Sequence, residues 1–140
     1  MKAIQHYLVI AARPADVFMA LTTQNGLAAW WTEEVIAQPI EGSIAEFKFG
    51  DRYHNKMSID RLVSGSLVEW TCLAGDEEWI DTRLTFRLES RDQGTILRFK
   101  HGNWRAETDF FASCNYHWGN YMTSLKNYCE NGQGSPFRRG

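Results

Sequence analysis

The chain has 140 residues, of which 44% are hydrophobic and 23% charged, and its formal net charge is −2. This size and composition are typical of one soluble globular domain, and the lack of a basic stripe argues against a nucleic-acid partner. No apolar run approaches the roughly 18 residues that a membrane-spanning helix requires. The opening stretch MKAIQHYLVI does not have the pattern of a signal peptide, so we expect a cytoplasmic protein.

Cysteine and aromatic content narrow the choice further. The three cysteines are odd in number and widely spaced, which predicts reduced thiols rather than a disulfide framework. Aromatic residues make up 14% of the chain, with six Trp, eight Phe and five Tyr. Such an excess indicates either a large aromatic core or a cavity with aromatic walls.

The N-terminal part of the chain is predicted to contain one strand and two short helices. Residues 3–11 are rich in β-forming side chains and predict a strand. Pro14 is a favourable first residue for a helix over 14–23, whose apolar residues recur at helical spacing. Asn25 is an acceptable N-cap for a second, shorter helix that ends at Trp31.

The middle of the chain is predicted to form an antiparallel meander. Apolar and polar residues alternate around 45–49, and further strands are expected at about 53–63, 67–73, 84–88 and 96–101. Short turns separate these strands at a spacing of about ten residues, which is typical of antiparallel sheets. With the first strand, this gives a sheet of about six strands.

A long amphipathic helix is predicted at about 108–131, and Gly132 is placed to end it. Its apolar stripe is spaced by three or four residues and consists of Phe111, Cys114, Trp118, Tyr121, Leu125 and Tyr128. This stripe must be buried on one face of the sheet. A curved sheet closes imperfectly around a helix, so the gap between them is a natural place for a cavity. Residues 1–140 are expected to form a single domain, with a polar, frayed tail at 132–140.

Three stretches resemble a known family: AARPADVFMALTTQNGLAAWW, GTILRFKHGNW and YHWGNYMTSLKNYCENGQGSP. They are similar to the START-like, or SRPBCC, helix-grip superfamily. Within it, they most resemble single-domain homologues of the C-terminal domain of the activator of the heat-shock-protein-90 ATPase. The resemblance implies an α+β helix-grip fold. In that fold a curved antiparallel sheet of about six to seven strands wraps around a long C-terminal helix, and two short helices follow the first strand.

The resemblance also implies a deep, mostly apolar pocket between the long helix and the sheet. Members of this superfamily bind lipids, sterols, polyketides or other hydrophobic molecules. Some are cyclases or lyases, and some assist a chaperone. Function is not fixed by the fold alone, because one fold supports several of these activities.

The neighbouring tryptophans Trp30 and Trp31 raise a question of their own, because adjacent residues on a helix point in different directions. On the resemblance, one indole packs beneath the short helix and the other faces the pocket mouth. We expect Trp31 to be the anchor and Trp30 the mouth residue. The alternative is that both indoles pack in the core or its rim.

Strand parity and the helical stripe give a set of candidate ligand-binding side chains besides the two tryptophans. Their alternative role is ordinary core packing, but as a set their flat aromatic area favours a cavity wall. The candidates are Phe47, Phe49, Trp70, Phe86, Phe99, His101, Phe111, Cys114, Trp118 and Tyr121.

Polar groups in such a pocket would orient a ligand. His101 continues an apolar parity into the expected pocket, with Tyr121 and His6 as further choices, and each histidine has a hydrogen-bonded structural role as its alternative. Cys114 and His117 have a spacing compatible with a shared metal, but two ligands do not make a zinc site. No nucleotide, dinucleotide or nucleophile motif is present, so we expect no metal and no cofactor.

The sequence therefore favours non-catalytic binding of a hydrophobic or amphipathic small molecule by a monomer or homodimer. One alternative is an enzyme of the same fold, a cyclase, hydrolase or lyase acting on a hydrophobic substrate. The other is a stress-related cofactor that binds a chaperone through its surface.

Overall fold

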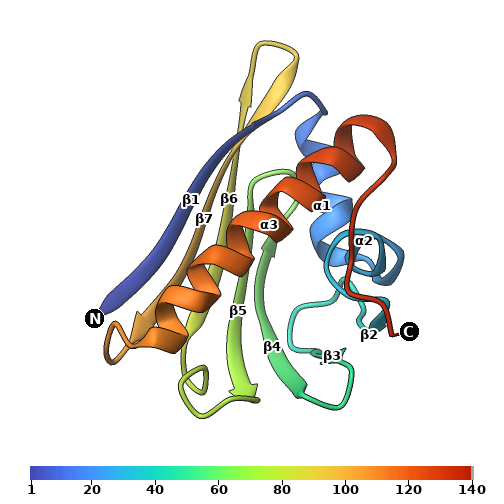
Figure 1. Cartoon of the computed structure of the whole chain (residues 1–140). Coiled ribbons are helices and arrows are strands. Elements are labelled where there is room, and N and C mark those ends of the chain that lie inside the picture. The colour runs from blue at the N-terminus through green and yellow to red at the C-terminus, as the bar shows by residue number, and fades with distance from the viewer. Residues whose placement is uncertain (140) are drawn as a thin grey trace.

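The computed structural model describes residues 1–139 as one sheet with three helices (Figure 1). The strands are ordered β1-β7-β6-β5-β4-β3-β2, and every neighbouring pair is antiparallel. In chain order the elements are β1 (Lys2–Ile10), α1 (Pro14–Thr22), α2 (Gln24–Trp30), β2 (Glu34–Ile36), β3 (Ile44–Phe49), β4 (Tyr53–Val63), β5 (Leu67–Ala74), β6 (Arg83–Arg91), β7 (Gly94–Trp104) and α3 (Asp109–Asn131).

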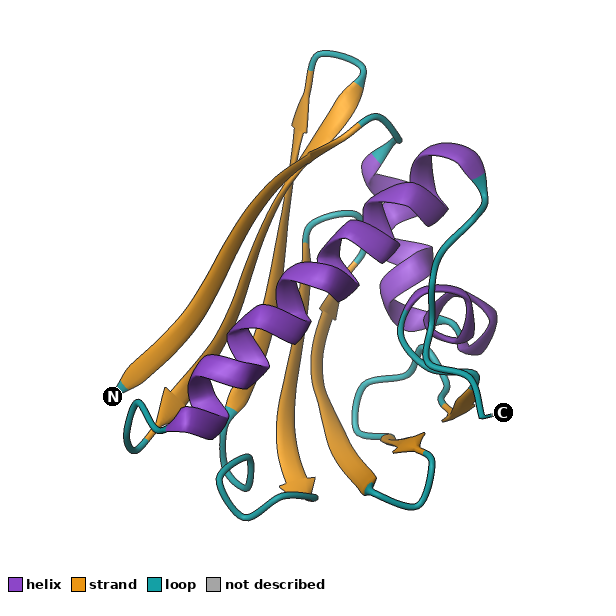
Figure 2. Ribbon diagram, in the orientation of Figure 1, coloured by secondary structure: helices purple, strands orange, loops and turns teal. Residues whose placement is uncertain are grey.

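The predicted fold class is confirmed. Helix α3 runs diagonally across one face of the sheet, while α1 and α2 lie together near the C-terminal end of α3 (Figure 2). The β4–β5 pairing shifts register twice, between Lys56 and Met57 and between Ile59 and Arg61, and such bulges bend a sheet. The seven strands include one that the sequence did not suggest, the three-residue β2.

Helix α3 begins and ends where its sequence predicted. The Thr108 hydroxyl accepts a hydrogen bond from the backbone N–H of Phe111 at 3.1 Å, which satisfies one free donor of the first turn. Gly132 ends the helix in the left-handed conformation at φ 82°. The stripe side chains Cys114, Trp118 and Leu125 are buried, so the helix packs on the sheet through the predicted face.

The second short helix begins differently from the prediction. Its N-cap is Thr23 rather than Asn25, because the Thr23 hydroxyl accepts from the backbone N–H of Gly26 at 3.0 Å. Gly26 lies where α1 and α2 approach most closely. A Cβ atom at this position would stand 2.6 Å from the Cα of Ala20, so only glycine lets the two helices pack at this distance.

The C-terminal segment, expected to be a frayed tail, makes specific contacts over residues 137–139. The backbone of Phe137 pairs with the loop after α2, donating to the Trp31 carbonyl at 2.9 Å and accepting from Glu33 at 3.1 Å. The Arg139 guanidinium contacts carboxylates of Glu34 and Asp51, each at 3.0 Å. These contacts hold the segment beside β2. The spacing of apolar residues in the sequence does not predict them. Residue 140 of the predicted tail lies outside the described residues.

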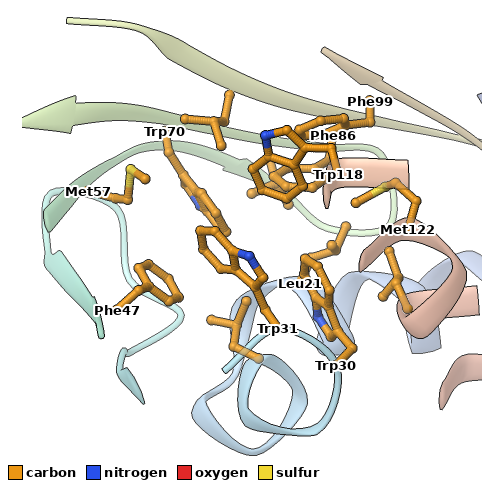
Figure 3. Close-up of a cluster of buried hydrophobic side chains, with 14 of the residues drawn as sticks. Leu21, Trp30, Trp31, Phe47, Met57, Trp70, Phe86, Phe99, Trp118 and Met122 are labelled. Atoms are coloured by element: carbon orange, nitrogen blue, oxygen red, sulfur yellow. The ribbon is translucent and has the colours of Figure 1, made fainter. Parts of the chain in front are cut away.

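The core is aromatic at its centre. Figure 3 shows Trp31 between Trp70 and Phe47 on one side and Trp30 on the other. The centroids of Trp31 and Phe47 are 4.5 Å apart, and those of Trp31 and Trp70 are 6.0 Å apart. The two tryptophans at the end of α2 thus join the short helices to the sheet.

Two glycine-to-alanine variants test this packing with opposite signs. Gly26→Ala should destabilise the protein by about 1–3 kcal/mol, because the added methyl collides with the backbone of α1. Gly119→Ala, inside α3, should stabilise it by about 0.5–1 kcal/mol, since its methyl would meet only the His6 ring, at 3.5 Å. Urea unfolding measures both free energies, and an unchanged or raised value for Gly26→Ala would contradict the close helix packing.

Candidate functional site: an aromatic cavity under helix α3

A cavity of about 460 Å³ lies between the N-terminal half of α3, the β3–β4 hairpin, the loop after β5 and the C-terminal segment. Its wall is mostly aromatic, from elements far apart in the sequence. The aromatic lining consists of Trp31, Phe49, Tyr53, Trp79, Phe110, Trp118, Tyr121 and Phe137.

Six further side chains give the cavity its polar character: Arg52, Asn55, Asp76, Ser113, Cys114 and His117. Arg52, Ser113 and His117 are exposed, which marks the side on which the cavity reaches the surface. Cys114 and Asn55 are buried and lie on its inner side. The lining is therefore graded from a charged mouth to an aromatic interior.

Three indoles form a stack along the wall. The rings of Trp79 and Trp118 are nearly parallel, at an interplanar angle of 13° and a centroid distance of 6.1 Å. Trp31 continues the stack from Trp118 at 5.2 Å and 28°. Large flat rings packed against one another resist collapse into the cavity, because they have few alternative rotamers.

The structure corrects the roles expected for the tryptophan pair, because both indoles are buried and Trp31, not Trp30, lines the cavity. Trp30 is fully buried away from the cavity, and its indole N–H donates to the Ala20 carbonyl of α1 at 2.8 Å. Trp31 reaches the cavity wall instead. The reason is that Trp30 is the last residue of α2 and faces α1, whereas Trp31 already lies in the turn toward the sheet.

His101 lies behind the wall, where it holds Trp118 in place. The indole N–H of Trp118 donates to Nδ1 of His101 at 3.1 Å, and Nε2–H of His101 donates to the Thr82 hydroxyl at 2.8 Å. The Thr82 hydroxyl in turn donates to the Trp79 carbonyl. Both ring nitrogens are thus engaged within the protein. Burial lowers the pKa of His101 to about 3, which keeps the imidazole neutral.

The predicted site residues fall into two groups. Trp31, Phe49, Cys114, Trp118 and Tyr121 come together around the cavity. The others do not line it: Trp30, Phe47, Trp70, Phe86, Phe99 and His101 are buried in the core, and Phe111 packs against Trp104. His6 also lies elsewhere, stacked on Phe99, with a buried Nε2 that has no hydrogen-bond partner among the described residues.

Sequence reasoning missed several lining residues. Asn55 shares the inward strand parity of Met57 and Ile59, which was a usable signal. Phe110 precedes the predicted stripe by one position. Trp79 and Phe137 lie outside regular elements, in the loop after β5 and the C-terminal segment, so no periodicity could have identified them.

Cys114 is not activated for chemistry. Its sulfur accepts a hydrogen bond from the Trp79 indole N–H at 3.4 Å, and burial raises the pKa of the thiol to about 11. A protonated thiol is a poor nucleophile and a poor metal ligand. Within residues 1–139, no three His, Cys, Asp or Glu side chains gather as metal ligands would. None of the helices in that range has the length and apolar character needed to cross a membrane.

The His101 network predicts a specific pH dependence. An unfolded histidine takes up a proton below about pH 6.5, whereas the native imidazole does not until about pH 3. The contribution of His101 to stability is therefore complete above pH 6.5 and is lost as the pH falls toward 3, by up to about 1.4 kcal/mol per pH unit. In urea unfolding between pH 7 and pH 4.5, the stability difference between wild type and His101→Gln should shrink. A pH-independent difference would contradict a buried neutral imidazole.

Known proteins share this architecture. The sequence profile of the family described as Activator of Hsp90 ATPase homolog 1-like protein matches residues 11–130. The solution structure of the Aha1 dimer from Colwellia psychrerythraea is 36% identical, covers 96% of this chain and 100% of its own, and superposes with a TM-score of 0.87. Among curated proteins, none matches the chain.

More distant structures show the same fold alone. Protein SSP2350 from Staphylococcus saprophyticus has 15% identity over 98% of this chain and 100% of its own, with a TM-score of 0.80. CalU16 from Micromonospora echinospora has 19% identity over 95% of this chain and 76% of its own, with a TM-score of 0.74. The profile match and the Colwellia relative confirm the family that the three sequence stretches indicated: the chain belongs to the Activator of Hsp90 ATPase homolog 1-like proteins.

Proposed function

We propose that this protein binds a hydrophobic or amphipathic small molecule, lipid-like or aromatic, in the cavity under α3. The observation that carries the proposal is the cavity itself, about 460 Å³ with eight aromatic side chains in its wall. Small-molecule sites commonly measure about 300–1,000 Å³ and combine an apolar wall with a few polar groups. This cavity has both properties.

Affinity would come mainly from removing apolar ligand surface from water, at roughly 25 cal/mol per Å². The deep end of the cavity, at Trp31, Trp118 and Cys114, offers such a surface. The mouth, with Arg52 and His117, allows a polar end of the ligand to stay hydrated. An amphipathic molecule fits this gradient better than a fully apolar one.

Binding is favoured over catalysis by the state of the two most reactive side chains. Cys114 is held as a thiol, and His101 is turned away from the cavity with both nitrogens occupied. General acid–base or nucleophilic catalysis needs a group of this kind within reach of the substrate. A cyclase or lyase would have to work with the other polar side chains of the lining, such as Asp76, His117 and Tyr121.

A cavity-filling variant tests the proposal. Cys114→Phe places a phenyl ring in the cavity and should weaken binding of the fluorescent probe 1-anilinonaphthalene-8-sulfonate at least ten-fold. Fluorescence titration measures the Kd, and indole quenching reports contact with the tryptophan wall. Ser113→Trp, at the exposed mouth, repeats the test without burying extra volume in the core.

The matched control is Asn115→Phe, which adds the same ring to the exposed side of α3. Its probe affinity should equal that of wild type. Unfolding midpoints of all variants separate lost binding from lost folding. If folded Cys114→Phe binds the probe with the same Kd as wild type, the cavity is not the binding site.

A second candidate function is a chaperone cofactor that acts through its surface. It is favoured by the 36% identity to the Colwellia protein named Aha1 and by membership of a family described by Hsp90 ATPase activation. The same variant distinguishes the two functions. Stimulation of a heat-shock-protein-90 ATPase that survives Cys114→Phe supports surface action, whereas stimulation lost with the probe site links the chaperone to the cavity.

The assembly state has its own test. The Colwellia structure is described as a dimer, which favours a homodimer over a monomer for this chain. Light scattering during size-exclusion chromatography should then give the mass of two chains. The mass of one chain at micromolar concentration would contradict a stable homodimer.

A further inference from the structure

One buried polar side chain in the cavity has no partner in the protein. Asn55 is only 4% exposed and lines the cavity from β4, on the inward face that also carries Met57 and Ile59. None of the side-chain hydrogen bonds within residues 1–139 involves its amide, and the amide atoms are not among the sealed, unpartnered polar atoms there, so they are open to the cavity. The sheet thus directs a free amide into an otherwise aromatic interior.

Such a group is unusual in a folded protein. Nearly all buried polar side chains are hydrogen-bonded to protein groups or to water, and the Asn55 amide can find a partner only among molecules that enter the cavity. A leucine at position 55 would continue the apolar parity of β4 and would leave the inner wall without this polar group. The amide is therefore best explained by a partner that enters the cavity.

The neighbouring loop leaves room for the amide in this position. Gly75, directly after β5, lies against it, and a Cβ atom there would stand 2.3 Å from Oδ1 of Asn55. Gly75 also adopts φ +143°, which disfavours residues with side chains. Any other residue at 75 would push the amide out of place.

The chemistry of the amide and of the walls defines the partner. A neutral amide offers two N–H donors and a carbonyl acceptor, which suit a neutral carbonyl or hydroxyl group. A buried carboxylate would need a cation beside it, and Arg52 is exposed at the mouth, with its guanidinium over the Tyr53 ring. The eight aromatic side chains of the wall favour a flat aromatic molecule, since aromatic rings pack well against one another.

We propose that the ligand is a planar aromatic molecule bearing a carbonyl or hydroxyl group, and that the Asn55 amide binds this group while the indole wall holds the rings. This assignment rests on the proposed function, since it names the ligand class of the same cavity. It makes Asn55 a specificity-determining residue. Strand parity shows that Asn55 points inward, but parity alone does not show whether the side chain lines the cavity or packs in the core.

The test compares two probes of equal shape, 2-naphthol and 2-methylnaphthalene, which differ in a hydroxyl and a methyl group. Their Kd values are measured by displacement of 1-anilinonaphthalene-8-sulfonate from wild type and from Asn55→Leu. The ratio of the 2-methylnaphthalene Kd to the 2-naphthol Kd should fall about ten-fold in Asn55→Leu, the size expected for one buried hydrogen bond. Asn115→Leu, on the exposed side of α3, should leave the ratio unchanged.

Two other outcomes separate the role of Asn55 from the binding function of the cavity. If both probes bind and the ratio is the same in wild type and Asn55→Leu, the cavity binds ligands but Asn55 does not select them. If wild type binds neither probe nor the fluorophore, the proposed function fails and this assignment fails with it. Asn55→Ser, which withdraws the polar group from the cavity, should lower the ratio too and replaces Asn55→Leu if that variant does not fold.

Discussion

The hydrogen bond from the Trp118 indole to Nδ1 of His101 is the contact on which the position of α3 depends. Both groups are buried and need partners, so the helix packs where the indole, the imidazole and the Thr82 hydroxyl meet. This fixes the middle of α3 over β7. The N-terminal half of the helix then stands off the β3–β4 end of the sheet, and the cavity is the space that remains.

The aromatic excess of the chain serves the core and the cavity together. Phe47, Trp70, Phe86 and Phe99 fill the interior between sheet and helices, while Trp31 belongs to both, packing on Phe47 and facing the cavity. The inner part of the wall, at Trp31 and Trp118, is continuous with the packed core. The cavity is thus pre-formed, and a ligand that enters it does not have to order the side chains that it contacts.

Periodicity made the fold predictable, and its limits explain what was missed. The stripe of α3 and the alternation of β3 to β7 follow directly from side-chain spacing, and both are confirmed. Spacing could not show which of Trp30 and Trp31 faces the cavity, because the directions of the two indoles depend on how α1 packs. It could not place Phe137 either, since a backbone contact with Trp31 more than a hundred residues away holds it. Asn55 had the right parity, but parity does not separate a cavity wall from a core.

The central claim is that the cavity holds a small molecule, and native mass spectrometry of freshly purified protein tests it most directly. A bound ligand should appear as a reproducible extra mass, released on denaturation as an organic molecule with an aromatic system and a carbonyl or hydroxyl group. The bare mass of the chain, unchanged after exposure to fatty acids, sterols and hydroxylated polycyclic aromatics, would contradict the claim.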